Sequence, residues 1–82
     1  MFAEKIKDFA DRISGKLEDD LLQGALNYVD HNEETLAVEI LCDHLIEYDV
    51  QLSQEDLKFL KSILTSMKIN ISAPPFKYLD FS

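Results

Sequence analysis

The sequence is poor in residues that break helices or cross-link chains: its 82 residues include two glycines, two prolines and one cysteine. It has no tryptophan. The single cysteine, Cys42, excludes an internal disulfide framework and is typical of a reducing compartment. Cys42 follows Ile40 and Leu41 in an apolar segment that has no cations to lower the pKa of its thiol. We therefore predict a small buried side chain there, not a reactive thiol.

Long hydrophobic runs are also absent. No apolar run approaches the roughly 20 residues that a membrane helix requires. Residues 1–8 mix charged and apolar side chains and lack the apolar core of a signal peptide. We therefore expect a cytoplasmic protein without a membrane partner. A hydrophobic content of 46% with five phenylalanines argues against disorder, and the length predicts one domain over residues 1–82.

Cations are missing from the whole middle of the chain. The net charge is −8, which argues against nucleic-acid binding. From Leu17 through Leu57 there is no lysine or arginine. The carboxylates of this span are Glu18, Asp19, Asp20, Asp30, Glu33, Glu34, Glu39, Asp43, Glu47, Asp49, Glu55 and Asp56. All eight cations lie in the flanks, at Lys5, Lys7, Arg12, Lys16, Lys58, Lys61, Lys68 and Lys77.

Apolar residues recur at helical spacing in four segments. The periodicity predicts helices over about residues 2–13, 16–29, 33–48 and 54–68, the third being the most apolar and central. We expect Asn32 to cap the third helix and Gly24 to permit a close helix crossing within the second. Ser53 and Asp56 resemble a capping box that starts the fourth helix.

The pattern changes after Lys68. The Pro74-Pro75 pair excludes helix, yet the apolar residues from Ile71 to Phe81 are too many for a free tail. We expect an extended strap over residues 70–82 that lies across the helices. The predicted fold is therefore all-α, a small bundle of about four helices with an extended C-terminal strap.

No arrangement of residues indicates catalysis or metal binding. The chain lacks a nucleophile motif and a phosphate-binding loop, and acids on helix surfaces are usually solvated. His31 and His44 lie 13 residues apart without a metal-ligand spacing. We expect no enzyme activity, no cofactor and no metal. Tyr28 and Tyr48 each end a predicted helix and are either core residues or interface anchors.

The arrangement of acids in the third helix is not explained by helix stability. Glu39, Asp43 and Glu47 place like charges four residues apart, which destabilises a helix by a few tenths of a kcal/mol per pair. Such a surface is suited to attracting a cationic partner, and nucleases commonly present cationic surfaces. The candidate partner-binding residues are Asp19, Asp20, Tyr28, Asp30, Glu33, Glu34, Glu39, Asp43 and Glu47.

The segment from Asn27 to Glu33, followed by Leu36 to Leu45, resembles the MafI-type immunity proteins of polymorphic toxin and contact-dependent growth inhibition systems. The shared pattern is an acidic turn at Asn32-Glu33, an Ala-x-Glu core helix at residues 37–39, and a Leu-Ser helix start at residues 52–53. The resemblance covers residues 26–68. The colicin nuclease immunity proteins are similar in size and acidity, but their Tyr-Tyr-Pro signature is missing.

The resemblance implies a bacterial immunity protein that binds a cognate basic toxin nuclease one to one and neutralises it. The toxin would be an RNase, often of the EndoU type. Two alternatives remain at the level of the sequence. One is an acidic helical adaptor or anti-activator that binds a cytosolic regulatory partner, and the other is a self-associating structural subunit.

Overall fold

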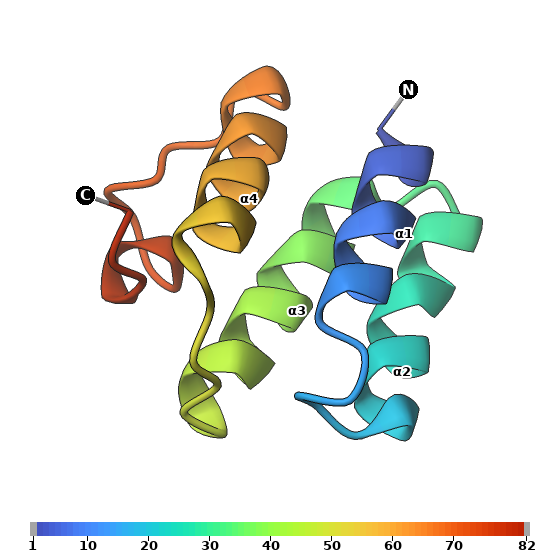
Figure 1. The fold of residues 1–82 in the computed structure, drawn as a ribbon. Coiled ribbons are helices and arrows are strands. Elements are labelled where there is room, and N and C mark those ends of the chain that lie inside the picture. Colours follow the sequence, from blue (N-terminus) through green and yellow to red (C-terminus); the bar gives the residue numbers. More distant parts are fainter. Residues whose placement is uncertain (1, 82) are drawn as a thin grey trace.

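The computed structural model describes residues 2–81, and every regular element in that range is helical. The helices are α1 (Ala3–Arg12), α2 (Asp19–Asp30), α3 (Glu34–Glu47) and α4 (Gln54–Ser66), followed by the short 3-10 helix η1 (Phe76–Tyr78) (Figure 1). Helix α1 packs against α2 and α4, while α3 packs against α2 and η1. The predicted all-α bundle is confirmed.

One apolar core joins the four helices. Helix α3 gives this core five buried residues, more than any other helix, which agrees with its predicted central position. No polar or charged residue is buried within residues 2–81. Removing each large apolar side chain from water contributes about 1.5–3 kcal/mol to folding. The largest fully buried side chains are Phe9, Ile6, Ile13, Leu41, Leu45, Leu60, Ile63, Leu64, Val38 and Cys42.

Helix α2 begins three residues later than predicted, at Asp19 instead of residue 16. The chain turns at Gly15, whose φ of +92° lies in the left-handed region that glycine adopts readily. The Lys16 backbone N–H donates to the Ile13 carbonyl oxygen at 2.9 Å, so these residues form a turn. Leu17 is nevertheless buried, because the turn directs it into the core.

Three helices end at a residue other than glycine in the left-handed region. These residues are Asn32, Asp49 and Lys68, with φ values of 60°, 51° and 60°. After each one, a backbone N–H donates to a carbonyl five residues earlier, as in a Schellman motif. The prediction that Asn32 caps α3 is therefore wrong: Asn32 ends α2, and the N-cap of α3 is Glu33, whose side chain makes no capping bond.

The prediction of a close helix crossing at Gly24 is also wrong. Gly24 is exposed, and a Cβ atom placed there would meet no atom within 4 Å. Helix α2 instead uses Leu22, Ala25 and Val29 as its buried contacts. Gly24 therefore has no packing role in the described fold.

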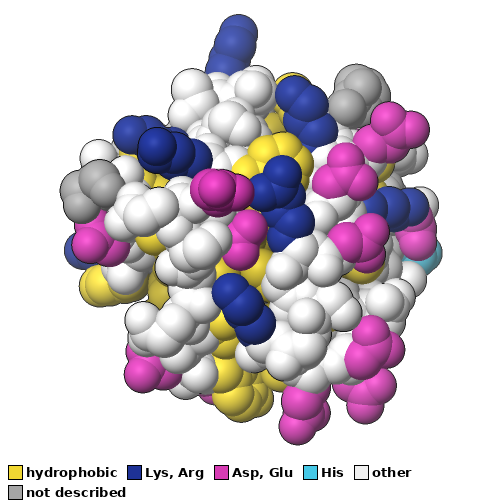
Figure 2. Space-filling model, viewed as in Figure 1, with side chains coloured by type: hydrophobic (Ala, Val, Ile, Leu, Met, Phe, Trp, Pro, Cys, Tyr) yellow, Lys and Arg dark blue, Asp and Glu magenta, His cyan; other side chains and the backbone are white. Residues whose placement is uncertain are grey.

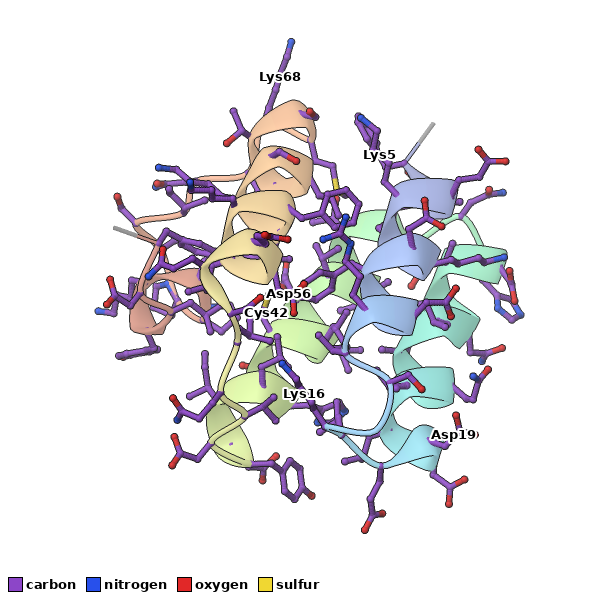
Figure 3. The ribbon with its side chains drawn as sticks, in the orientation of Figure 1. Lys5, Lys16, Asp19, Cys42, Asp56 and Lys68 are labelled. Atoms are coloured by element: carbon purple, nitrogen blue, oxygen red, sulfur yellow. The ribbon has the colours of Figure 1, made fainter. Side chains whose placement is uncertain are left out.

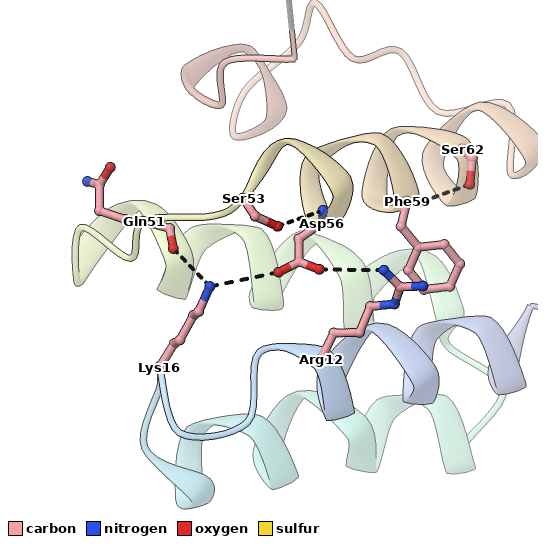
Figure 4. Close-up of polar contacts among 7 residues, drawn as sticks. All are labelled: Arg12, Lys16, Gln51, Ser53, Asp56, Phe59 and Ser62. Carbon is pink, nitrogen blue, oxygen red and sulfur yellow. Dashed lines mark hydrogen bonds and ion pairs between the residues drawn. The ribbon is translucent and has the colours of Figure 1, made fainter.

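The start of α4 is fixed by a cap and by an ion-pair cluster. Ser53 Oγ accepts the backbone N–H of Asp56 at 3.1 Å, as the predicted cap requires. The Asp56 carboxylate lies 3.6 Å from Arg12 Nη1 and 3.8 Å from Lys16 Nζ, which joins α4 to the end of α1 (Figure 4). The Arg12 guanidinium also lies over the ring of Phe59, 4.4 Å from its centroid.

The C-terminal segment lies against the bundle, but its conformation differs from the prediction. Residues 70–81 form turns and η1 in place of a fully extended strap, and residue 82 lies outside the described residues. Phe76 is buried with 4% of its surface exposed, and η1 contacts α3. The segment is therefore compact, and it forms one wall of the surface described below. Within residues 2–81, no helix combines the length and apolar content needed to cross a membrane.

Candidate protein-binding surface on α3

The charge separation seen in the sequence becomes a separation between helices. Helices α2 and α3 carry no lysine or arginine, and the cations lie on α1, on α4 and in the segments that follow these two helices. Figure 2 shows the face formed by α1 and α4, where basic side chains are spread among acidic ones. The α1–α4 face thus carries both signs, whereas α2 and α3 offer carboxylates only.

Several of the twelve acids have structural roles. Asp56 joins α4 to α1, and Asp30 pairs with Lys7 Nζ at 3.2 Å. Asp19 and Asp20 lie in the first turn of α2, where the helix dipole favours negative charge; Asp19 projects from the lower end of the bundle in Figure 3. These carboxylates therefore contribute to folding whether or not a partner is bound.

Glu39 and Asp43 have no such role. Neither makes a hydrogen bond or ion pair with a described residue, and Asp43 is exposed. Glu47 is exposed, and its Oε1 lies 4.0 Å from Nδ1 of His44. The three acids follow one another at four-residue steps, or about 6 Å along the helix axis. This α3 strip (Glu39, Asp43 and Glu47) is an uncompensated anionic surface.

An open groove lies beside the strip, between α3 and the C-terminal segment. Its volume is about 690 Å³, and we refer to it as the α3 groove. Ile40 and Ile46 from α3 and the two prolines of the C-terminal segment supply apolar walls, and Asp43 and Glu47 supply the acidic rim. The complete lining is Ile40, Asp43, His44, Ile46, Glu47, Pro74, Pro75 and Tyr78.

A second, smaller hollow of about 430 Å³ lies at the start of α3. It is lined by Asn32, Glu33, Glu34, Thr35, Leu36 and Glu39. Glu39 lines this hollow, and Asp43, which lies four residues later on the same side of α3, lines the groove. The α3 strip therefore runs from one depression to the other.

The exposed apolar side chains gather at the same helix. Among the described residues, three large hydrophobic side chains are exposed: Leu36 (39%), Tyr48 (55%) and Tyr78 (63%). Leu36 lies on α3, Tyr48 follows its last turn, and Tyr78 belongs to η1, which packs on α3. Tyrosine is enriched at protein-binding surfaces and among their binding hot spots. For Tyr48, the interpretation as a core residue is wrong.

The structure brings together only some of the predicted binding residues. Glu33, Glu34 and Glu39 line the hollow, and Asp43 and Glu47 line the groove. Asp19, Asp20 and Asp30 lie on α2 and line neither depression. Tyr28 is half-buried against the core, as its interpretation as a core residue predicts.

The sequence reasoning missed the apolar half of this surface. Ile40 belongs to the most apolar of the predicted helices, but it is only partly buried and lines the groove. Pro74, Pro75 and Tyr78 reach the groove through a long-range contact that periodicity does not reveal. One feature of the sequence could have indicated the groove. Ile46 follows the core residue Leu45 on a helix rich in apolar residues, so its apolar side chain faces another side of the helix.

Among the described residues, the α3 surface has neither an accessible thiol nor a group of metal ligands. Cys42 is completely buried. Burial, and to a lesser extent the charges of Asp43 and Glu39, raise the pKa of its thiol to about 12, so the thiol is inert at neutral pH. Within residues 2–81, no three His, Cys, Asp or Glu side chains are grouped to hold a metal ion. Comparison of the chain with protein-family models, curated proteins and solved structures gave no match.

Proposed function

We propose that this protein is an immunity-type inhibitor that binds a cognate basic toxin nuclease domain one to one through the outer side of α3. The observation that carries the proposal is the α3 strip. Its acids repel one another, and every lysine and arginine of the chain lies elsewhere, so none of them offsets the repulsion. A repulsion of this kind is relieved when cations of a partner approach it.

The proposed mechanism is steric and electrostatic. A nuclease binds its polyanionic substrate through lysine and arginine side chains, and the carboxylates of α3 offer these cations an alternative anion. In this proposal the toxin is an RNase of the EndoU type, which the sequence resemblance implies, and it is met in the cytoplasm, where its RNA substrate is found. A typical interface of about 800 Å² per partner is less than a fifth of the 5134 Å² accessible surface.

Co-expression tests this function. The protein is produced together with the candidate toxin domain, which we expect to be encoded immediately upstream of its gene. We expect the two to co-purify in equal amounts, and we expect the protein to restore growth to cells that express the toxin domain alone. If the toxin domain neither binds the protein nor is neutralised by it, the proposal is wrong.

The apolar α3 groove also suits a second candidate function. In that function the protein is an acidic adaptor or anti-activator that docks on a cytosolic regulatory protein. Amphipathic helices commonly bind in apolar grooves of this kind. Gene neighbourhood separates the two functions, because a regulator or enzyme operon in place of a toxin gene favours the adaptor.

A further inference from the structure

The α3 groove differs from the acidic strip in what it can recognise. The strip attracts any cation, whereas a groove with aliphatic and proline walls selects for an apolar side chain. At about 690 Å³, the groove has room for one or two large side chains of a partner. The groove therefore adds a requirement that charge alone does not impose.

The rim of the groove defines the chemistry around that apolar side chain. Asp43 and Glu47 line the same groove as Ile40 and Ile46, so a ligand that fills the groove brings its neighbouring side chains to two carboxylates. Lysine or arginine side chains one helical turn from the ligand's apolar side chain would pair with both carboxylates. A wholly apolar ligand would leave these carboxylates partly desolvated and unpaired, which is unfavourable.

Tyr78 strengthens the same preference. Its ring is 63% exposed and lines the groove, and Nζ of Lys77 already lies 5.1 Å from the ring centroid. The ring therefore accepts a cation on one face within the protein itself. A partner lysine or arginine would meet an aromatic side chain and two carboxylates within one depression.

We infer that the α3 groove binds a cationic amphipathic segment of the partner protein, with an apolar side chain between Ile40, Ile46 and the Pro74-Pro75 wall, and with flanking cations on Asp43 and Glu47. The inference rests on the proposed function for the basic nature of the partner. It adds the apolar anchor and assigns the C-terminal segment to the binding site.

The probe is a synthetic amphipathic peptide of leucine and lysine, about five helical turns long (roughly 18 residues). A matched peptide of the same charge carries serine in place of each leucine. Both are titrated into the ¹⁵N-labelled full-length protein and followed by NMR. We expect the leucine peptide to bind at least about tenfold more tightly and to shift the amides of Ile40, Ile46 and Tyr78 most.

Two single tyrosine variants test the site. Tyr78→Ala removes a groove residue, and Tyr48→Ala removes a tyrosine of similar exposure that does not line the groove. Because both side chains are largely exposed, both variants should fold. We expect Tyr78→Ala to weaken binding of the leucine peptide about tenfold and Tyr48→Ala to change it less than about twofold.

The inference is overturned if the two peptides bind equally, if neither binds, if the largest shifts lie away from the groove, or if both tyrosine variants behave alike. These outcomes are distinguishable from failure of the proposed function. A toxin domain that binds wild type and Tyr78→Ala equally would leave the function standing and remove the groove from it. If the leucine peptide binds in the groove but no toxin domain binds the protein, the groove inference stands and the proposed function is wrong.

Discussion

Cys42 lies in the interior of the molecule on α3, and two acids of the same helix, Glu39 and Asp43, lie close to it in sequence (Figure 3). Burial and these two charges, in that order, raise the pKa of the thiol from 9.0 to about 12. The residue therefore couples the core to pH only under alkaline conditions. In the physiological range it behaves as a small apolar side chain.

This coupling predicts how stability depends on pH. Above pH 9.0 the unfolded chain loses the Cys42 proton, whereas the folded chain keeps it until about pH 12. The unfolded state then binds fewer protons, so the Cys42 contribution to stability is complete below pH 9.0 and falls as pH rises toward 12. Urea unfolding should show a steeper loss for wild type than for Cys42→Ala across this range. Parallel slopes would contradict the assigned burial.

Gly24 offers a prediction of the opposite sign. It lies inside α2, is exposed, and leaves open space for a Cβ atom. Gly24→Ala should therefore raise the free energy of unfolding by about 0.5–1 kcal/mol, because alanine reduces the conformational entropy of the unfolded chain. Gly15→Ala is the matched control: at a φ of +92° the same change should destabilise the protein. A loss of stability in Gly24→Ala would indicate a contact that the structure does not contain.

At the scale of elements, two ion-pair arrangements join the helices with different expected strengths. The Asp56 side chain is 13% exposed and faces both Arg12 and Lys16, whereas the Asp30 side chain is 63% exposed and faces Lys7 alone (Figure 4). Exposed pairs contribute little because water screens them, and partial burial strengthens the pair. The α1–α4 contact should therefore depend on Asp56.

We expect Asp56→Asn to lower the free energy of unfolding by about 1–2 kcal/mol, since it removes the one carboxylate that pairs with both Arg12 and Lys16. Asp30→Asn should cost less than about 0.5 kcal/mol. Denaturant unfolding at low salt measures both. Equal effects would show that the Asp56 cluster is no stronger than a surface pair.

The α3 strip should affect stability and binding in opposite directions. Asp43→Lys replaces two repulsions, with Glu39 and Glu47, by two attractions at four-residue spacing. We expect the free protein to gain about 0.5–1 kcal/mol in its free energy of unfolding and to bind the toxin domain more weakly. If Asp43→Lys destabilises the free protein, the strip does not carry the repulsion that supports its functional assignment.

The sequence predicted helices better than it predicted contacts between distant segments. The α1, α3 and α4 ranges and the Ser53 cap follow from periodicity and local hydrogen bonding, which act over a few residues. Asn32 was misassigned because the same residue type favours both a helix start and a left-handed helix end. The groove was missed because its two walls, Ile40 on α3 and Pro75 in the C-terminal segment, are 35 residues apart in the chain, and only the tertiary fold brings them to one depression.

For the whole molecule, the distribution of charge between helices is the central feature. The α1–α4 face mixes positive and negative side chains (Figure 2). The only Lys, Arg, Asp or Glu residues on α2 and α3 are acids, so the part of the molecule that these helices form is strongly anionic. Such an asymmetry orients the protein toward a cationic partner during encounter and speeds association most at low ionic strength. The proposed binding therefore depends on where the acids lie and not on the total charge of −8.

Two triple variants separate position from total charge. One reverses the α3 strip, Glu39→Lys, Asp43→Lys and Glu47→Lys. The other reverses three exposed acids of α1 with similar spacing, Glu4→Lys, Asp8→Lys and Asp11→Lys. Each variant replaces three negative charges by three positive ones, so both change the net charge from −8 by six to −2.

The decisive measurement is the Kd of each variant for the proposed cognate toxin domain at low and high salt, with folding checked by circular dichroism. We expect reversal of the α3 strip to weaken binding by about 100-fold at low salt and less at high salt, because rim and contact charges act through screened interactions. Reversal on α1 should change Kd only about threefold, through net charge alone. Equal losses in the two variants, or no loss on reversal of the strip, would contradict the account.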